Sequence, residues 1–182
     1  MRILILGYGN PSRMDDGVGH FVVNRLNAAW GLPAVDVLGE PGEETARVGG
    51  HAVTTRWVQQ LDMGLAEEVA AADQVLFVDA HVDPPDIVVA EVTSGQHHGV
   101  TSHVLTPETV VALAESCFGR RPPAWRCSVR GARWGFGVGL SPAVETHALA
   151  LAEQIRRVTE TGSGTVSCQT PPETVPDPVS HA

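Results

Sequence analysis

The sequence predicts an α/β fold in which helices cover both faces of a mostly parallel sheet. Short, bulky apolar runs alternate along the chain with segments whose apolar residues recur at helical spacing, and this alternation is typical of βαβ units. The apolar runs are continuous, as strands buried on both faces require. A length of 182 residues suits one domain.

The first predicted strand is the apolar run 2–6, and an amphipathic helix follows over about 17–30, where apolar residues recur at helical spacing. Residues 35–50 carry several glycines and acids. We interpret this stretch as an acidic surface excursion with at most a short strand at 35–38. The next strand is predicted over 53–58, which contains two threonines and a tryptophan.

The middle of the chain continues the alternation. Asp62 stands where an N-cap would precede a short helix over 63–72. The four consecutive apolar residues 75–78 predict a central strand, and 87–92 predict another.

The last predicted helices both begin with a hydroxyl residue followed by proline. Thr106 starts a helix that runs to about 118, with an acid in its first turn to balance the helix dipole. A strand is predicted over 126–129, and Ser141 opens the final helix. We expect one domain over 1–161 and a disordered tail over 162–182, because the tail is rich in Gly, Ser, Thr and Pro and has no aromatic residue.

Composition excludes several classes of protein. Twelve basic residues, all arginine, stand against 21 acidic ones, which gives a net charge of −9 and argues against a nucleic-acid partner. We expect no membrane segment, because the chain has no apolar run of about 18 residues. Three cysteines without CxxC spacing predict neither a disulfide framework nor a structural zinc site, and they favour a reducing cytoplasm.

Ligand sites of parallel α/β sheets lie beyond the carboxyl ends of the strands, so residues that follow strands are the candidates. The first such loop begins Gly7-Tyr8-Gly9, close to a dinucleotide fingerprint. Ser12 stands where the third glycine belongs, and the helix begins too late to cradle a pyrophosphate. Dinucleotide binding is therefore the weakest of the hypotheses for this chain.

Acidic and imidazole side chains stand in three separate segments between the predicted strands and helices. Asp15 and Asp16 stand at a helix start, where we expect one of them to cap the helix and balance its dipole. Adjacent residues point in different directions, so we do not expect both in one site. Asp79 directly follows the strand 75–78, and His103 precedes the helix at Thr106. Two carboxylates and an imidazole from separate loops would suit a divalent metal and leave coordination positions open.

The chain also resembles a known family. Residues 1–10 with Arg13 and 15–19 are similar to the opening of the nickel–iron hydrogenase maturation endopeptidases. Further similar blocks follow in the same order and extend the resemblance to about 1–157: Phe77-Val78-Asp79-Ala80, Ser102-His103-Val104-Leu105-Thr106-Pro107 and Gly137-Val138-Gly139-Leu140-Ser141-Pro142-Ala143-Val144.

The resemblance implies a three-layer α/β/α sandwich with a twisted, mostly parallel sheet. It also implies a cytoplasmic endopeptidase, an aspartyl-type hydrolase, that removes the C-terminal extension of a nickel-loaded hydrogenase large-subunit precursor. Its catalytic and nickel-recognising residues map onto Asp16, Asp79 and His103. The nickel arrives with the substrate and is no permanent cofactor. We expect a monomer whose partner is that precursor.

Two features bear on mechanism. The chain has neither a Gly-x-Ser-x-Gly elbow nor a plausible Cys–His pair, which argues against a covalent acyl intermediate; whether metal or a carboxylate activates the water stays open. Residues 57–61, Trp-Val-Gln-Gln-Leu, stand where some family members carry an acidic, glycine-rich segment.

The alternative hypothesis for the function is a nickel-sensing chaperone that uses Asp16, Asp79 and His103 without cutting the precursor.

Overall fold

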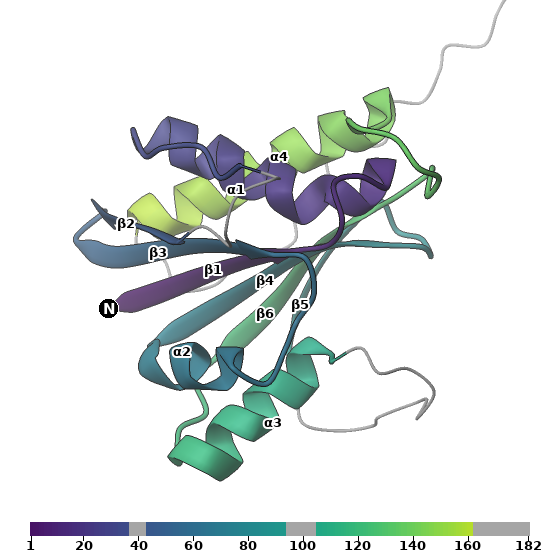
Figure 1. Cartoon of the computed structure of the whole chain (residues 1–182). Helices are drawn as coiled ribbons and strands as arrows, with labels where there is room; N and C mark the ends of the chain where they lie inside the picture. Colours follow the sequence, from purple (N-terminus) through teal and green to yellow (C-terminus); the bar gives the residue numbers. More distant parts are fainter. Residues whose placement is uncertain (37–42, 94–104, 162–182) are drawn as a thin grey trace, which may run out of the picture.

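In this computed structural model the described residues are 1–36, 43–93 and 105–161. They form a six-stranded sheet with the strand order β2-β3-β1-β4-β6-β5 (Figure 1). The strands are β1 Arg2–Tyr8, β2 Glu43–Val48, β3 His51–Val58, β4 Gln74–His81, β5 Ile87–Glu91 and β6 Ala124–Arg130. The helices are the short 3₁₀ helix η1 Met14–Gly17, α1 Val18–Ala29, α2 Leu65–Ala71, α3 Pro107–Phe118 and α4 Pro142–Thr161.

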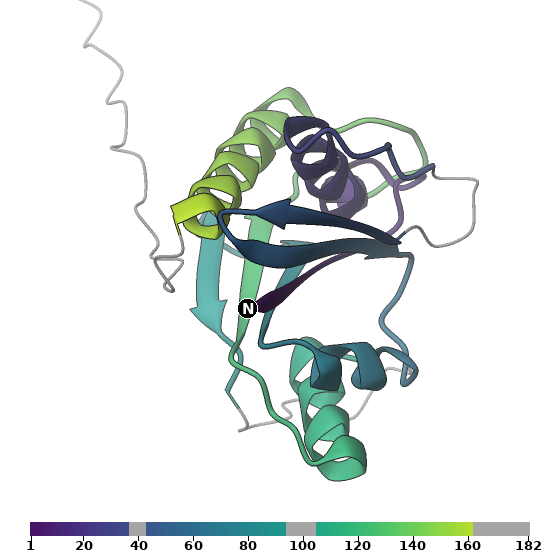
Figure 2. The same cartoon turned by 90° about the vertical axis from the view of Figure 1, so that its left-hand side faces the viewer.

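The helices form a layer on each side of the sheet. Helices α1 and α4 pack together over one face, and α2 and α3 pack together over the other (Figures 1 and 2). Strands β3, β1, β4 and β6 run parallel, whereas the edge strands β2 and β5 are antiparallel to their neighbours. The α/β sandwich expected from the sequence is confirmed.

The central strands are buried on both faces. Along β1, Ile3 and Ile5 belong to the core under α1 and α4, and Leu4 and Leu6 belong to the core over α2 and α3. Successive side chains of a strand point to opposite faces, so the continuous apolar run fills both cores. Because both faces of β1 are buried, its sequence is a continuous apolar run, and that run predicts a strand.

The prediction for residues 35–50 was wrong over its second half. Residues Glu43–Val48 form β2, which pairs antiparallel with β3 and alternates more exposed with less exposed side chains. An edge strand needs apolar residues on one face only and carries charges that discourage further pairing. Its acids therefore gave the impression of a loop. Residues 35 and 36 belong to no strand, and 37–42 lie outside the described residues.

The helix boundaries are close to those expected. Thr106 caps α3 by accepting a hydrogen bond from the Thr109 amide at 3.4 Å, and α3 ends at Gly119 with a left-handed φ of 66°. Helix α2 begins two residues later than predicted, because Asp62 accepts from the Gly64 amide at 2.7 Å and forms a turn ahead of the helix. Among the described helices, none is long and apolar enough to cross a bilayer.

Candidate functional site

A cleft of about 220 Å³ lies at the carboxyl ends of β1, β3 and β4. This is the position at which parallel α/β sheets bind ligands. Three segments supply its walls: the loop after β1, the segment after β3 and the end of β4. The lining residues are Tyr8, Gly9, Asn10, Arg13, Asp16, Gln59, Gln60, Leu61 and Asp79.

The structure brings Asp16 and Asp79 to this one cleft, against the backbone of Gly9. A Cβ atom placed on Gly9 would lie 2.1 Å from the Asp16 carbonyl oxygen and 3.4 Å from Asp79 Oδ1, and Gly9 has a φ of 115°. Only glycine tolerates this conformation and this approach. Asp16 Oδ2 also accepts a hydrogen bond from the Asn10 amide at 3.1 Å, which fixes its side chain within the first loop.

Asp79 is mostly buried at the end of β4. The pKa of Asp79 is raised from 3.8 to about 7: burial is the main cause and the charge of Asp16 adds to it, while the Ala80 amide and the Tyr8 hydroxyl act in the opposite direction by favouring the ionised form. Burial, and then the charge of Asp79, raise the pKa of Tyr8 well above 10. Tyr8 therefore stays a proton donor facing a carboxyl group that can exchange its proton near neutral pH.

Asp15 has a different environment from its neighbour. It is fully buried, and its carboxylate accepts hydrogen bonds from the amides of Ala132 at 2.9 Å and Arg133 at 2.7 Å. The amide and hydroxyl of Ser141 donate to it at 2.6 and 2.8 Å. The prediction that one of the two acids caps a helix was wrong, because neither η1 nor α1 has a side-chain cap; both acids do lie in the first turn of η1, where acids balance the helix dipole. Asp15 ties the loop 131–141 to the first loop.

Backbone bonds complete the connection between these two loops. The Met14 amide donates to the Gly137 carbonyl at 3.0 Å, and the Gly137 amide donates to the Ser12 carbonyl at 2.9 Å. The Asp15 amide donates to the Arg133 carbonyl at 3.1 Å. The loop between β6 and α4 and the loop between β1 and α1 therefore form one hydrogen-bonded unit, which adjoins the cleft through Arg13; Figure 1 shows the course of both loops.

No family model and no curated protein matches the chain, but solved structures do. The solution structure of an endopeptidase from Escherichia coli matches with a TM-score of 0.66 and 22% identity, over 90% of this chain and 94% of that one. The NiFe hydrogenase maturation protease HycI from Thermococcus kodakarensis KOD1 matches with a TM-score of 0.63 and 22% identity, over 87% of this chain and 92% of that one. The hydrogenase maturating endopeptidase HybD from E. coli matches with a TM-score of 0.62 and 20% identity, over 89% of this chain and 94% of that one. The chain shares their fold.

His103 lies outside the described residues, and in the described part of the chain no three His, Cys, Asp or Glu side chains gather where they could hold a metal ion. The roles of Asp16, Asp79 and His103 therefore stay predictions. Two residues of the cleft, Gln59 and Gln60, put amides on the wall formed by the segment after β3.

Sequence reasoning passed over Tyr8 and Ser141. Tyr8 stands between two glycines at the end of β1, and that position at a strand end was the available signal for a residue facing the site. Ser141 was assigned to the start of α4, which is correct, but its contact with Asp15 joins residues 126 positions apart. No local pattern reports such a contact.

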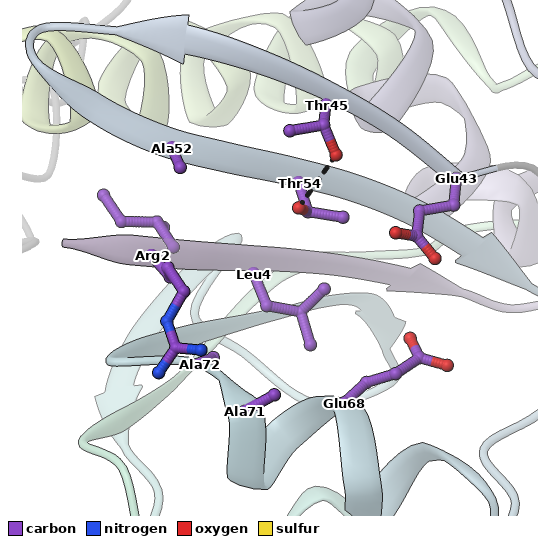
Figure 3. A pocket seen from close by; sticks show the side chains of 10 residues that line it. Arg2, Leu4, Glu43, Thr45, Ala52, Thr54, Glu68, Ala71 and Ala72 are labelled. Carbon is purple, nitrogen blue, oxygen red and sulfur yellow. Dashed lines mark hydrogen bonds between the residues drawn. The ribbon is translucent and has the colours of Figure 1, made fainter.

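A larger cavity, of about 310 Å³, lies beside α2 on the face of β1, β2 and β3 (Figure 3). Arg2 and Leu4 from the first half of β1 line it, so it is at the other end of the strand from the cleft. The hydroxyls of Thr45 and Thr54 bond to each other at 3.1 Å across its wall. It contains neither histidine nor cysteine, and we assign it no chemistry.

Proposed function

We propose that this chain is an endopeptidase that removes the C-terminal extension of a nickel-loaded NiFe hydrogenase large-subunit precursor. The observation that carries the proposal is the meeting of Asp16 and Asp79 at Gly9 in one cleft. The fold, shared with proteins described as hydrogenase maturation proteases, supports the same reaction. We place the reaction in the cytoplasm and the chain as a monomer.

Nickel belongs to the substrate in this proposal. Asp16, Asp79 and His103 would contact an ion that the precursor already holds, because three ligands leave positions open for the ligands of the substrate. An open site of this kind recognises a loaded precursor without removing its metal. A precursor without nickel would lack the group that these side chains recognise and would stay uncut.

Asp79 has the properties of a base for the hydrolysis. In the metal-free chain the pKa of Asp79 is raised to about 7, mainly by burial. The positive charge of the precursor's nickel would favour the carboxylate, and the carboxylate oxygen that does not contact the ion can accept a proton from water. The water oxygen then bonds to the scissile carbonyl carbon, the carbon–nitrogen bond breaks, and the proton passes from Asp79 to the leaving amine. The Tyr8 hydroxyl, a hydrogen-bond partner of Asp79, orients this carboxyl group.

The described cysteines do not offer an alternative nucleophile. Cys127 is buried in β6, where burial raises the pKa of its thiol to about 12. Cys117 is exposed near the end of α3 and does not line the cleft. A thiol acts as a nucleophile in its ionised form, so direct attack by water is the mechanism we propose.

The test replaces His103 by Ala, and separately Asp79 by Asn, in a host that expresses the hydrogenase partner. We expect the large subunit to keep its full precursor mass, measured by mass spectrometry. A subunit shortened as in the wild type would refute the proposal.

The chaperone alternative is separated by purified components. Wild-type protein mixed with nickel-loaded precursor should release a C-terminal peptide, and precursor without nickel should release none. A stable complex without a released peptide would instead indicate a nickel-sensing chaperone.

A further inference from the structure

The loop between β6 and α4 presents two exposed apolar side chains beside the cleft. Phe136 is 92% exposed and Val138 is 86% exposed, more than any other large apolar residue in the described part of the chain. They flank Gly137, whose amide and carbonyl are both bonded to the first loop. Exposed apolar residues that cluster, unlike scattered ones, mark interaction sites.

The backbone that carries this pair is held in place. The Gly137 bonds to Ser12 and Met14 measure 2.9 and 3.0 Å. The buried carboxylate of Asp15 binds the same loop at both of its ends, through Ala132 and Ser141. Phe136 and Val138 are therefore presented by a fixed surface, and a partner that binds them does not have to order a loose loop.

Two arginines lie in the same two hydrogen-bonded loops as the apolar pair. Arg13 and Arg133 are exposed, and neither forms an ion pair with any described residue. Arg13 Nη2 donates to the Trp134 carbonyl at 3.2 Å and also lines the cleft. Guanidinium groups that form no ion pair with a described residue are available to bind a partner's carboxylate through charge-assisted hydrogen bonds.

The cleft alone is too small to select a protein substrate. Its volume of about 220 Å³ is below the roughly 300 Å³ at which small-molecule pockets begin. Specific protein complexes bury about 800 Å² on each partner. Most of the contact with a protein substrate must therefore form outside the cleft, on the surfaces that adjoin it.

We propose that Arg13, Arg133, Phe136 and Val138 form a docking surface, the rim patch, for the polypeptide substrate. The segment that binds there carries apolar side chains next to a carboxylate. This inference rests on the proposed function, because it takes the substrate to be a protein. The rim patch adjoins the cleft through Arg13, so a segment bound on it leads directly to Asp16 and Asp79.

The test uses the double variant Phe136→Ser/Val138→Ser and the single variant Arg133→Glu. In Arg133→Glu the backbone bonds to Asp15 are kept, because they involve main-chain atoms of residue 133. The matched controls are Phe118→Ser, a half-exposed phenylalanine at the far end of α3, and Arg47→Glu, an exposed arginine on β2. Thermal unfolding of every variant confirms that it is folded.

The readouts are kcat and KM for cleavage of the nickel-loaded precursor, and the Kd of the precursor from a binding titration. We expect KM and Kd to rise about 10-fold or more in the double variant, the usual loss when central apolar anchors are truncated, with kcat within about twofold. Arg133→Glu should also raise KM and weaken its dependence on salt. The controls should match the wild type.

Two results would overturn the rim patch. One is a double variant whose KM and Kd stay within about twofold of the wild type. The other is a wild-type dimer that becomes monomeric in the double variant, which would make the rim patch an interface between two copies of this chain. A wild type that binds the precursor without cutting it would defeat the proposed function, and the Kd values would still decide the rim patch.

Discussion

Replacing Asp15 by Asn should destabilise the whole chain, although the change removes one charge and alters almost no volume. Asp15 Oδ2 accepts from Ala132, Arg133 and the Ser141 hydroxyl, and Oδ1 accepts from the Ser141 amide. An amide has one acceptor oxygen, so at least one of these donors would face an NH₂ group. The side chain is fully buried, and water cannot replace the missing acceptor.

The size of the effect follows from these contacts. A hydrogen bond to a charged group contributes about 1.5–3 kcal/mol, and at least one is lost. The bonds that remain change from charge-assisted to neutral, which roughly halves their strength. We therefore expect the free energy of unfolding to fall by about 3 kcal/mol or more, measured by urea denaturation at neutral pH.

Asp16→Asn is the matched control, because it makes the same change one residue away. Asp16 accepts one amide, from Asn10 at 3.1 Å, and lines the open cleft. Its loss should change stability by less than about 1 kcal/mol and should abolish cleavage of the precursor. Two results would refute the division of roles between the two acids. One is a free energy of unfolding of Asp15→Asn that lies within about 1 kcal/mol of the wild-type value. The other is a free energy of unfolding of Asp16→Asn that falls as far as that of Asp15→Asn.

Three further predictions concern the same site. Burial raises the pKa of Asp15, but its hydrogen bonds lower it more, to below 3.8. The ionised group therefore stabilises the fold at pH values above the unfolded pKa. As the pH is lowered from about 4, the free energy of unfolding of the wild type should decrease more steeply than that of Asp15→Asn. Gly9→Ala should abolish cleavage, because the added Cβ would lie 2.1 Å from the Asp16 carbonyl; an active variant would contradict this geometry. Carboxyl NMR of the metal-free chain should give Asp79 a pKa of about 7 that falls in Asp16→Asn yet stays above 3.8, since burial is the main cause; an unchanged pKa would separate the two acids.

The parts of the fold that could be predicted are those whose signal is local. The run from Ile3 to Leu6 fills cores on both faces of the sheet, and such continuous apolar runs have few alternative interpretations. Thr106 and Gly119 mark the ends of α3 through contacts within one helical turn. Strand β2 was missed because an edge strand is stabilised by its pairing with β3, which its own residues do not report.

The site divides in the same way. Asp79 could be predicted because it follows the four apolar residues of β4, and strand ends of a parallel sheet meet at one edge. Asp16 came from the resemblance of the first loop to a known family. The role of Asp15 could not be predicted, because its donors lie 117 to 126 residues further along the chain. A fully buried carboxylate and a partly exposed one look identical in the sequence Asp15-Asp16.

These two adjacent acids also connect the cleft to the rim patch. Asp16 is fixed within the first loop by the Asn10 amide, whereas Asp15 fixes the loop that carries Phe136. The assay is run well below the unfolding temperature of the Asp15→Asn variant, so that the protein is still folded. Under these conditions we expect the rim patch to become less fixed in position, while Asp16 changes its position less. We therefore expect this variant to raise KM, as the rim-patch variants do, with a smaller loss of kcat than Asp16→Asn. An Asp15→Asn enzyme that loses kcat while keeping the wild-type KM would show that Asp15 acts on the position of Asp16 and leaves substrate docking unaffected.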